Sequence, residues 1–522
     1  MGWELDAVEK PFVEQLLGLG WRYVAGDLDH PSSTGRTNFT QVIQEATLRR
    51  NLHEFNVLEI HTQAVPWLDD EPLSEAVGAI TRIGADRLME ANRAATELLL
   101  GGMTVEGLPG WDGGRGQNIH FIDWAHPDRN DFSDINQFRV DCPPGYNRGK
   151  SFIVPDLVLL VNGIPLVVVE CKSPSCPEPL AEAVDQLRRY TNQRKASFEV
   201  EDNEGNEPLF HTNQLLIATS FDEARVGSVG AGMRHYAAWK TVVPRTESDV
   251  AASLGKTDLS EQERLIAGLL APANLLHVVR HFTLFMNGDG QTVKAVCRYQ
   301  QYRAVHLAIE RLRTGETRSQ DGEHDRRGGI VWHTQGSGKS LTMVFLIRRL
   351  RTDRALRRFK VVVVTDRTDL EDQLSGTAAL TGETVELATS AAALRALLRR
   401  KGPGLVFGMI QKQRGGDAAG EPALTTADPP QRVEAREPPG ALDVLNDDDS
   451  ILVLVDEAHR SQAGDLQAAL QVGLPNCARI GFTGTPILMG DKKRTHEIFG
   501  EFIDRYTIRE AEADGAIVPI LY

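Results

Sequence analysis

The amino-acid sequence predicts an α/β protein with two domains, and three observations support this prediction. The chain has 522 residues, more than a single hydrophobic core usually serves. Between residues 118 and 219, short apolar strands lie among amphipathic helices. Beyond residue 262, strands and helices alternate, and the strands are almost wholly apolar, which is typical of a parallel sheet buried on both faces.

Composition limits the class of protein. Hydrophobic residues make up 41% of the chain and charged residues 25%, as in an ordinary globular protein. A formal net charge of −15 argues against a protein that coats polyanions but allows a local basic groove. The cysteines are too few and too scattered for a disulfide framework or a zinc site: Cys142, Cys171, Cys176, Cys297 and Cys477.

The sequence contains no sign of a membrane or secretory segment. No apolar run approaches the ~20 residues that a membrane-spanning helix needs. The first residues form neither a secretory signal nor a myristoylation site. We therefore expect a cytoplasmic protein without a membrane partner.

The first half of the chain begins with helices and continues with strands. Apolar residues recur at helical spacing, which predicts helices over residues 11–21, 39–52 and 73–101. From residue 118 the spacing becomes that of strands, with one further helix over residues 180–193. The predicted strands cover residues 118–123, 137–140, 156–161, 166–169 and 214–219.

A polar, charged stretch over residues 244–262 is interpreted as the boundary between the domains, which are expected to span residues 1–255 and 256–522. Two other polar segments, residues 314–327 and 413–449, are expected to be flexible insertions. The strands predicted in the second domain cover residues 330–332, 361–364, 405–407, 451–455 and 478–482.

A glycine-rich segment between a predicted strand and a predicted helix reads His333-Thr-Gln-Gly-Ser-Gly-Lys-Ser340. Its glycines let backbone N–H groups face a phosphate, Lys339 can reach terminal phosphates, and the Ser340 hydroxyl can bind Mg²⁺. His333 stands where this pattern usually has its first glycine. By itself, such a segment could also be a helix N-terminus with a solvated lysine. The residues predicted to contact a nucleotide are Thr334, Gly336, Ser337, Gly338, Lys339 and Ser340.

Two acidic residues, Asp456 and Glu457, follow the strand predicted over residues 451–455. Asp456 would hold Mg²⁺ through water, and Glu457 would position or activate the water that attacks the phosphate. Alone, the pair could be an ordinary charged strand end. The glycine-rich segment and this pair both follow apolar parallel strands, where ligands bind in α/β sheets, so together they predict a nucleotide-hydrolysing site.

These motifs resemble those of superfamily 2 nucleic-acid motors of the DEAD/H type, whose motor domains are RecA-like. The resemblance rests on Asp456–His459 and on Thr483-Gly-Thr-Pro486. Gln301 matches the glutamine that reads adenine in such motors, and residues 365–367 and 410–412 match loops that touch the DNA backbone. Taken singly, Gln301 could be an exposed helix residue and the loops ordinary solvated loops. The resemblance implies ATP and Mg²⁺ as cofactors and duplex DNA as a partner.

Charged residues also mark two neighbouring strands in the first half: Asp156 opens one, and Glu170 and Lys172 close the next. Strand alternation puts Glu170 and Lys172 on one face, on either side of Cys171. Two carboxylates on adjacent strands can hold Mg²⁺, and Lys172 can polarise the attacking water or neutralise the scissile phosphate. A salt bridge at a sheet edge would explain the same three residues.

The following predicted helix favours the catalytic interpretation. Gln186 and Tyr190 are one helical turn apart and therefore share a face. With the preceding strands they resemble the PD…ExK and QxxxY motifs of RecB-like nucleases. The resemblance implies a PD-(D/E)xK endonuclease domain with Asp156, Glu170, Lys172, Gln186 and Tyr190 in its catalytic site, and with Asp156 and Glu170 as metal ligands.

A nuclease domain placed before a DEAH motor resembles the restriction (HsdR) subunits of type I restriction–modification enzymes. Asn162-Gly-Ile-Pro-Leu166 is more particular to that family than the catalytic triplet, and Asn136-Gln-Phe138 and Asp514-Gly-Ala-Ile-Val-Pro519 also match. Glu9 falls on the first helix, where the family carries an additional acidic residue. The resemblance implies ATP-dependent DNA translocation, Mg²⁺-dependent cleavage of unmodified duplex DNA, and modification and specificity subunits as partners.

The resemblance ends with the first motor domain. The family's chains continue through a second RecA-like domain and a helical region that docks on the methyltransferase, whereas this sequence ends at Tyr522. We therefore expect it to bind ATP and Mg²⁺ without an arginine from a second motor domain. Two other functions remain open: a stand-alone nuclease–helicase of another defence system, and a non-catalytic DNA- and nucleotide-binding subunit.

Overall fold

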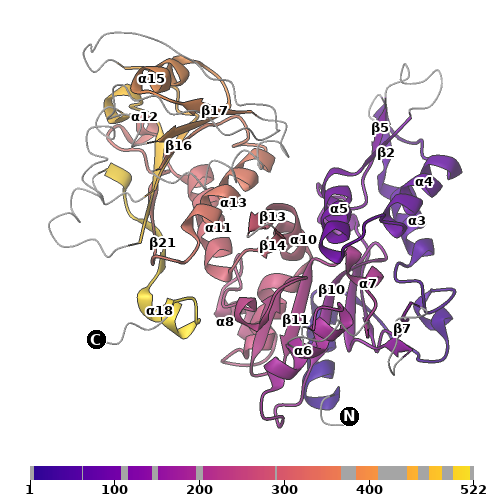
Figure 1. The fold of residues 1–522 in the computed structure, drawn as a ribbon. Helices are drawn as coiled ribbons and strands as arrows, with labels where there is room; N and C mark the ends of the chain where they lie inside the picture. Colours follow the sequence, from indigo (N-terminus) through magenta and orange to yellow (C-terminus); the bar gives the residue numbers. More distant parts are fainter. Residues whose placement is uncertain are drawn as a thin grey trace. The chain divides into compact units, whose positions relative to one another are not determined.

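The computed structural model describes residues 5–60, 63–106, 116–143, 151–194, 204–288, 291–365, 384–409, 444–456, 470–484 and 498–517. Contacts between residues divide the chain into two compact units, residues 1–299 and 300–522 (Figure 1). Residues 256–299 therefore belong to the first unit by their contacts, whereas the sequence suggested a boundary after residue 255. For example, the Gln262 amide donates to the Val8 carbonyl at 3.2 Å, and the Trp21 indole donates to the Leu270 carbonyl at 2.9 Å.

The first unit is built on a mixed six-stranded sheet. Strands β1 and β6 are parallel, as are β10 and β11, and the other neighbours are antiparallel. Strands β9 and β10 form a hairpin whose turn residues, Asn162 and Gly163, have φ angles of 53° and 80°. In spatial order the strands are β1 (Arg22–Val24), β6 (Phe132–Asn136), β9 (Leu157–Val161), β10 (Ile164–Cys171), β11 (Leu215–Thr219) and β12 (Ala224–Gly227).

Helix α6 (Pro179–Tyr190) covers one face of this sheet (Figure 1). Leu187 and Tyr190 share a buried core with Val158, Leu160 and Val168 of the β9–β10 hairpin. This packing holds the helix over the hairpin. The remaining helices of the unit are α2 (Lys10–Gly18), α3 (Glu45–Phe55), α4 (Asp70–Thr81), α5 (Leu88–Gly101), α7 (Pro208–His211), α8 (Glu247–Ser253), α9 (Glu261–Leu265) and α10 (Pro272–His281), with π-helical turns at Leu5–Glu9 and Ile266–Leu270 and 3-10 turns at Pro31–Thr34, Pro127–Arg129 and Met233–His235. Its small hairpins are β2–β3 (Val57–Ile60, Gln63–Pro66), β4–β5 (Met103–Val105, Gln117–Ile119), β7–β8 (Val140–Asp141, Phe152–Ile153) and β13–β14 (Thr283–Gly288, Gln291–Val296).

Several elements of the first unit differ from the sequence predictions. The strand predicted over residues 137–140 is wrong, because β6 ends at Asn136 and Gln137 turns the chain with a φ angle of 44°. The Gln137 N–H then donates to the Asp156 carbonyl at 2.8 Å instead of continuing the β6 ladder. The helices predicted over residues 73–101 are confirmed as α4 and α5.

The second unit is built on a seven-stranded sheet in which all neighbouring strands are parallel. The five strands predicted from their apolar sequence are confirmed, and β16 and β19 are buried along their whole length. The two edge strands, β17 and β21, were missed because each contains charged residues. In spatial order the strands are β17 (Val385–Ala388), β18 (Gly404–Met409), β16 (Lys360–Thr365), β19 (Ile451–Val455), β20 (Ala478–Thr483), β15 (Gly329–His333) and β21 (Phe502–Tyr506). The accompanying helices are α11 (Tyr299–Thr314), α12 (Arg318–Asp321), α13 (Lys339–Thr352), α15 (Ala391–Arg399) and α18 (Ile508–Ala513).

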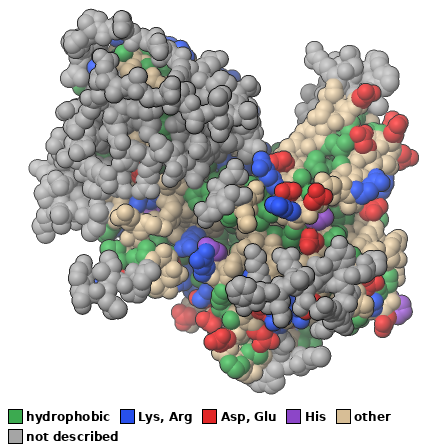
Figure 2. Space-filling model, viewed as in Figure 1, with side chains coloured by type: hydrophobic (Ala, Val, Ile, Leu, Met, Phe, Trp, Pro, Cys, Tyr) green, Lys and Arg blue, Asp and Glu red, His purple; other side chains and the backbone are tan. Residues whose placement is uncertain are grey.

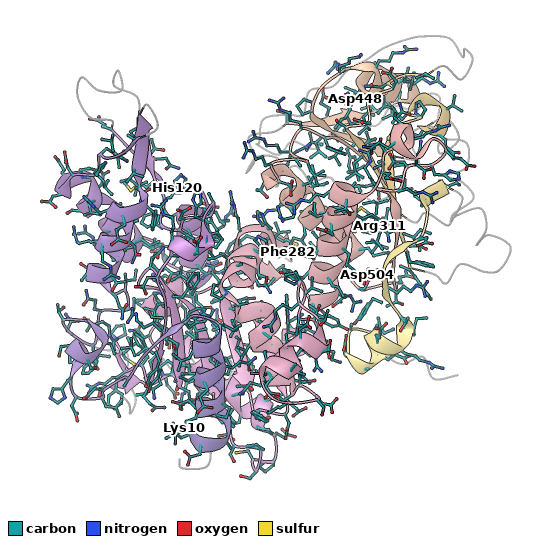
Figure 3. The ribbon with its side chains drawn as sticks, turned by 180° about the vertical axis from the view of Figure 1, so that it is seen from behind. Lys10, His120, Phe282, Arg311, Asp448 and Asp504 are labelled. Carbon is teal, nitrogen blue, oxygen red and sulfur yellow. The ribbon has the colours of Figure 1, made fainter. Side chains whose placement is uncertain are left out.

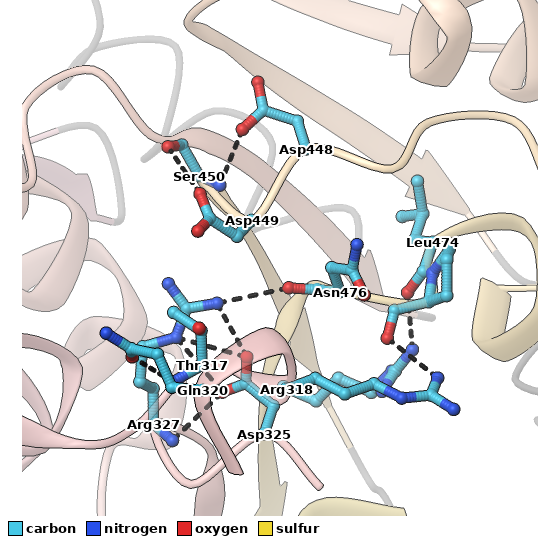
Figure 4. A network of polar contacts seen from close by, with 12 residues as sticks. Thr317, Arg318, Gln320, Asp325, Arg327, Asp448, Asp449, Ser450, Leu474 and Asn476 are labelled. Carbon is cyan, nitrogen blue, oxygen red and sulfur yellow. Dashed lines mark hydrogen bonds and ion pairs between the residues drawn. The ribbon is translucent and has the colours of Figure 1, made fainter. Parts of the chain in front are cut away.

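Residues 314–327 were predicted to form a flexible insertion, but they contain a short helix, α12, and are held by hydrogen bonds (Figure 4). Its end is held by Arg327, whose guanidinium donates to both carboxylate oxygens of Asp325 and to the Asn476 carbonyl. The second predicted insertion lies outside the described residues over 413–443. In its described end, the Ser450 N–H donates to the Asp448 carboxylate at 2.8 Å.

Charge is mixed on the visible surface of the first unit. Figure 2 shows acidic and basic side chains interspersed on that face. The net charge of −15 is therefore not gathered there into a patch of one sign. In the part of the chain that the structure describes, no helix has the length and apolar character to cross a membrane.

Candidate catalytic and nucleotide-binding sites

The structure brings Asp156, Glu170 and Lys172 together at one end of the β9–β10 hairpin. Val169 pairs with Leu157 across the hairpin, so Glu170 lies beside the position that Asp156 occupies just before β9. The Cys171 N–H donates to Asp156 Oδ2 at 2.7 Å, and Lys172 Nζ lies 2.9 Å from Glu170 Oε1. Glu170 is wholly buried and Lys172 is 8% exposed.

Gln186 and Tyr190 reach this group from α6. The Tyr190 hydroxyl donates to the Val154 carbonyl at 3.1 Å and accepts from Gln186 Nε2 at 2.6 Å. Burial raises the pKa of Tyr190, and the negative charges of Glu170 and Asp156 raise it further. The two side chains therefore hold the backbone two residues before Asp156.

Glu9 is joined to the same end of the sheet. Its carboxylate accepts from Asn136 Nδ2 at 2.9 Å and from Gln137 Nε2 at 3.4 Å. Gln137 in turn donates its backbone N–H to the Asp156 carbonyl. Glu9 is thus linked to the backbone of Asp156 through a single residue, Gln137.

The donor atoms of the β9–β10 group suit a hard cation. Carboxylate oxygens are the ligands that Mg²⁺ prefers, and Mg²⁺ is usually held by one or two carboxylates with water or phosphate completing its shell. Asp156 and Glu170 fit that pattern. Among the described residues there is no cluster of three or more His, Cys, Asp or Glu side chains that could hold a metal by itself.

The predicted phosphate loop connects β15 to α13 in the second unit. Gly336 and Gly338 have φ angles of 82° and 85°, a left-handed conformation that favours glycine. Gly338 is the N-cap of α13, so the first N–H groups of this helix are presented by the loop. The Ser337 hydroxyl is buried and has no hydrogen-bond partner among the described residues. An unpartnered donor in this position fits a phosphate oxygen.

Residues at the ends of three other strands lie near this loop or near one another. The Thr365 hydroxyl, at the end of β16, donates to Asp456 Oδ2 at 3.2 Å, after β19. A Cβ added at Gly484, after β20, would lie 2.8 Å from Lys339 Nζ, so the backbone of Gly484 adjoins the lysine. Lys339 Nζ itself donates to the His333 carbonyl at 3.3 Å. The sequence suggested Thr365 only as part of a loop that touches the DNA backbone, and its contact with Asp456 was not predicted.

Some predicted site residues lie outside the described residues. They are Glu457, Thr485, Pro486, Asp366, Arg367, Gln411 and Lys412. Thr334 and Ser340 are described: the Thr334 N–H donates to the Tyr506 carbonyl at 3.0 Å, and Ser340 is half-buried in the first turn of α13.

Gln301 adjoins the phosphate loop. Its side-chain Nε2 donates to the Gly338 carbonyl at 3.0 Å, which connects α11 to the N-terminus of α13. The residue is 3% exposed. The interpretation of Gln301 as an exposed helix residue is therefore wrong.

The parallel sheet with its phosphate loop is the architecture of a nucleotide-dependent motor unit. Residues 300–522 match the family described as SWI2/SNF2 ATPase, and residues 4–234 match the family described as Type I restriction enzyme R protein N terminus. Together the two matches cover both units. The chain therefore carries the N-terminal domain of type I restriction enzyme R proteins and a SWI2/SNF2 ATPase domain, in agreement with the sequence motifs.

Similar proteins are endonuclease subunits by name. The chain is 33% identical to the Type I restriction enzyme HindI endonuclease subunit of Haemophilus influenzae, over 99% of this chain and 45% of that protein. It is 26% identical to the putative type I restriction enzyme MjaIXP endonuclease subunit of Methanocaldococcus jannaschii, again over 99% and 45%. The chain thus spans about half the length of these relatives.

A solved structure shares a weaker similarity. It is a nuclease-deletion mutant of the Type ISP restriction-modification enzyme LlaGI in complex with a DNA substrate mimic, with 15% identity and a TM-score of 0.26 over 41% of this chain and 20% of that one.

Proposed function

We propose that this chain carries the endonuclease and the ATP-driven motor of a type I restriction enzyme, and that it translocates and cleaves unmodified duplex DNA. The observation that carries the proposal is the grouping of Asp156, Glu170 and Lys172 at one end of the β9–β10 hairpin. The same chain has a phosphate loop in its second unit. Its curated relatives are named endonuclease subunits of type I restriction enzymes.

In the first unit, we propose a PD-(D/E)xK nuclease site. Asp156 and Glu170 would hold Mg²⁺, which when bound supplies a Lewis acid and lowers the pKa of a coordinated water. The Cys171 N–H orients the Asp156 carboxylate, and Lys172 offers its ammonium group to the scissile phosphate or the attacking water. Gln186 and Tyr190 would act by positioning the segment that presents Asp156.

In the second unit, the loop N–H groups, Ser337 and Lys339 would bind the phosphates of ATP. Lys339 would exchange the His333 carbonyl for the terminal phosphates, because a charged oxygen is the stronger acceptor for an ammonium group. Ser340 and Asp456 would hold the Mg²⁺ that accompanies ATP, and Glu457 would orient the attacking water. Gln301 would turn its amide from the Gly338 carbonyl to adenine.

The partners follow from the family. We propose duplex DNA as the substrate, modification and specificity subunits as protein partners, and the cytoplasm as the location. The functional domains would span residues 1–255 and 256–522, with the segment after residue 255 linking the nuclease to the motor while contacting the first unit.

The test is reconstitution with modification and specificity subunits from the same locus. Cleavage of unmodified plasmid should require ATP and Mg²⁺, and prior methylation of the plasmid should prevent it. Glu170→Gln should abolish cleavage and leave ATP binding unchanged, whereas Lys339→Ala should abolish ATP binding. Asp131→Asn is the matched control, because Asp131 adjoins the same sheet but pairs with Arg22 and Arg50 instead.

Three results would contradict the proposal in whole or in part. Parental cleavage by Glu170→Gln would remove the nuclease assignment. ATP binding by Lys339→Ala at the parental affinity would remove the motor assignment. Cleavage without the other subunits would favour a stand-alone nuclease–helicase over a restriction subunit.

A further inference from the structure

One buried carboxylate joins three elements around the phosphate loop. Asp504 lies on β21 and its side chain is 6% exposed (Figure 3). Its Oδ2 lies 2.8 Å from His333 Nε2 of β15. Arg303 of α11 donates to both oxygens, at 2.8 and 3.2 Å, and also to the Arg505 carbonyl at 2.8 Å. A two-pronged guanidinium–carboxylate pair of this kind fixes direction as well as distance.

His333 anchors the start of the phosphate loop. Its side chain is wholly buried, and its ring packs edge-on against Tyr506 at 5.8 Å between ring centroids. Its carbonyl accepts from Lys339, the residue predicted to reach the terminal phosphates. The loop leaves the sheet directly after His333, so the packing of this ring fixes where the loop begins.

Arg303 anchors the helix that carries Gln301. The two residues are only two positions apart on α11, and a helix is rigid over that length. The carboxylate that holds His333 therefore also holds the helix from which Gln301 reaches the Gly338 carbonyl. The Asp504 carboxylate thus fixes the positions of both the phosphate loop and Gln301.

We infer that His333, Asp504 and Arg303 are positioning residues that set the spacing between the phosphate contacts and the base contact of the nucleotide site, and so determine selectivity for adenine nucleotides. This inference rests on the proposed ATP site. If the distance between the phosphate loop and Gln301 changes, the loop N–H groups can still bind the phosphates of a nucleotide. Its base, however, no longer lies where Gln301 can bind it. Discrimination between bases is then lost before phosphate binding is lost.

A purely stabilising ion pair would not have this effect, and the same unit provides one for comparison. Asp325 and Arg327 form a buried pair, each side chain 6% exposed, before β15 and thus at the opposite end of the sheet (Figure 4). Asp325→Asn should therefore lower the melting temperature without changing nucleotide selectivity.

The experiment measures the dissociation constants of ATP and GTP, with Mg²⁺, by displacement of a fluorescent ATP analogue from the 522-residue chain. Asp504→Asn and His333→Leu should weaken ATP binding about tenfold, a usual size for coupled contacts, and change GTP binding much less. His333→Gln should keep the parental ratio of the two constants, because its amide can donate from nearly the position of Nε2. Arg303→Lys keeps the charge but loses the planar fork, and should raise the ATP-to-GTP ratio of dissociation constants as Asp504→Asn does.

The outcomes separate this inference from the proposed function. Loss of melting temperature in Asp504→Asn with an unchanged ATP-to-GTP ratio, as expected for Asp325→Asn, would overturn the inference. So would a His333→Gln variant that behaves like His333→Leu, or a parent chain that binds both nucleotides equally. Parental ATP binding by Lys339→Ala would instead overturn the ATP site itself, and the inference with it.

Discussion

Asp134 on β6 is a carboxylate whose burial is only partly compensated. It is wholly buried, and neither carboxylate oxygen has a hydrogen-bond partner among the described residues. Burial raises the pKa of Asp134 to about 6, partly offset by its own backbone N–H and by the charge of Arg22. Ionisation of this residue at neutral pH therefore costs folding free energy.

The sign of the pH dependence follows from the raised pKa. The unfolded chain ionises Asp134 near pH 3.8, so the folded state loses stability as pH rises from about 4 to about 6, and the cost is then constant. Asp134→Asn should remove this slope and raise the free energy of unfolding at about pH 8 by up to about 3 kcal/mol. Urea unfolding at about pH 4 and about pH 8 measures both effects. Asp131→Asn should instead lose stability, because Asp131 has two arginine partners; an equal response of the two variants would contradict the assignment.

At the level of elements, the Tyr190 hydroxyl ties α6 to the segment before Asp156. Tyr190→Phe should lower the free energy of unfolding by about 1–2 kcal/mol, because the Val154 carbonyl and Gln186 each lose a partner. It should also lower the cleavage rate of the reconstituted enzyme by more than this loss of stability explains. Tyr236→Phe is the matched control, since its hydroxyl lies in the same core without a hydrogen-bond partner among the described residues. Removal of that hydroxyl should be neutral or stabilising, and equal losses in the two variants would exclude the positioning role.

Lys294 holds the β13–β14 hairpin to the rest of the first unit. Its buried ammonium donates to Asn92 Oδ1, the Asn213 carbonyl and Gln214 Oε1, at 2.8–3.0 Å. Lys294→Met would remove all three hydrogen bonds and should cost about 3–5 kcal/mol, although the Asn213 carbonyl keeps a donor in Asn92 Nδ2. Val293→Ala, on the exposed side of the same strand, should change stability by less than about 0.5 kcal/mol. Thermal unfolding distinguishes them, and a mild effect of Lys294→Met would show that the hairpin is held by other contacts.

At the scale of the whole molecule, the division into two compact units predicts two unfolding transitions. ATP with Mg²⁺ at about 100 times its dissociation constant should stabilise the second unit by about 2.7 kcal/mol and leave the first unit unchanged. Differential scanning calorimetry with and without the nucleotide measures this. Lys339→Ala should abolish the shift, and a shift of both transitions together would show that the units do not unfold independently.

Much of the candidate site could be predicted because its residues lie next to strongly patterned strands. The five apolar strands of the second unit and the Asn-Gly turn between β9 and β10 are local features, readable within a few residues. Asp156, Glu170 and Asp456 follow from them, since strand alternation and strand ends determine where such side chains point. Gln137 could not be predicted in this way, because the partner of its backbone N–H is Asp156, which lies far along the chain.

The sequence by itself determined the class of fold, the phosphate loop and the carboxylates of the β9–β10 hairpin. Only the tertiary structure decided which residues, distant in the sequence, contact the phosphate loop and the carboxylates. His333 and Asp504 are 171 residues apart, and they meet because β15 and β21 are neighbours in the sheet. The order of strands depends on the packing of the whole unit, whereas a motif depends on a few consecutive residues, and for this reason the His333–Asp504–Arg303 contact could be found only in three dimensions.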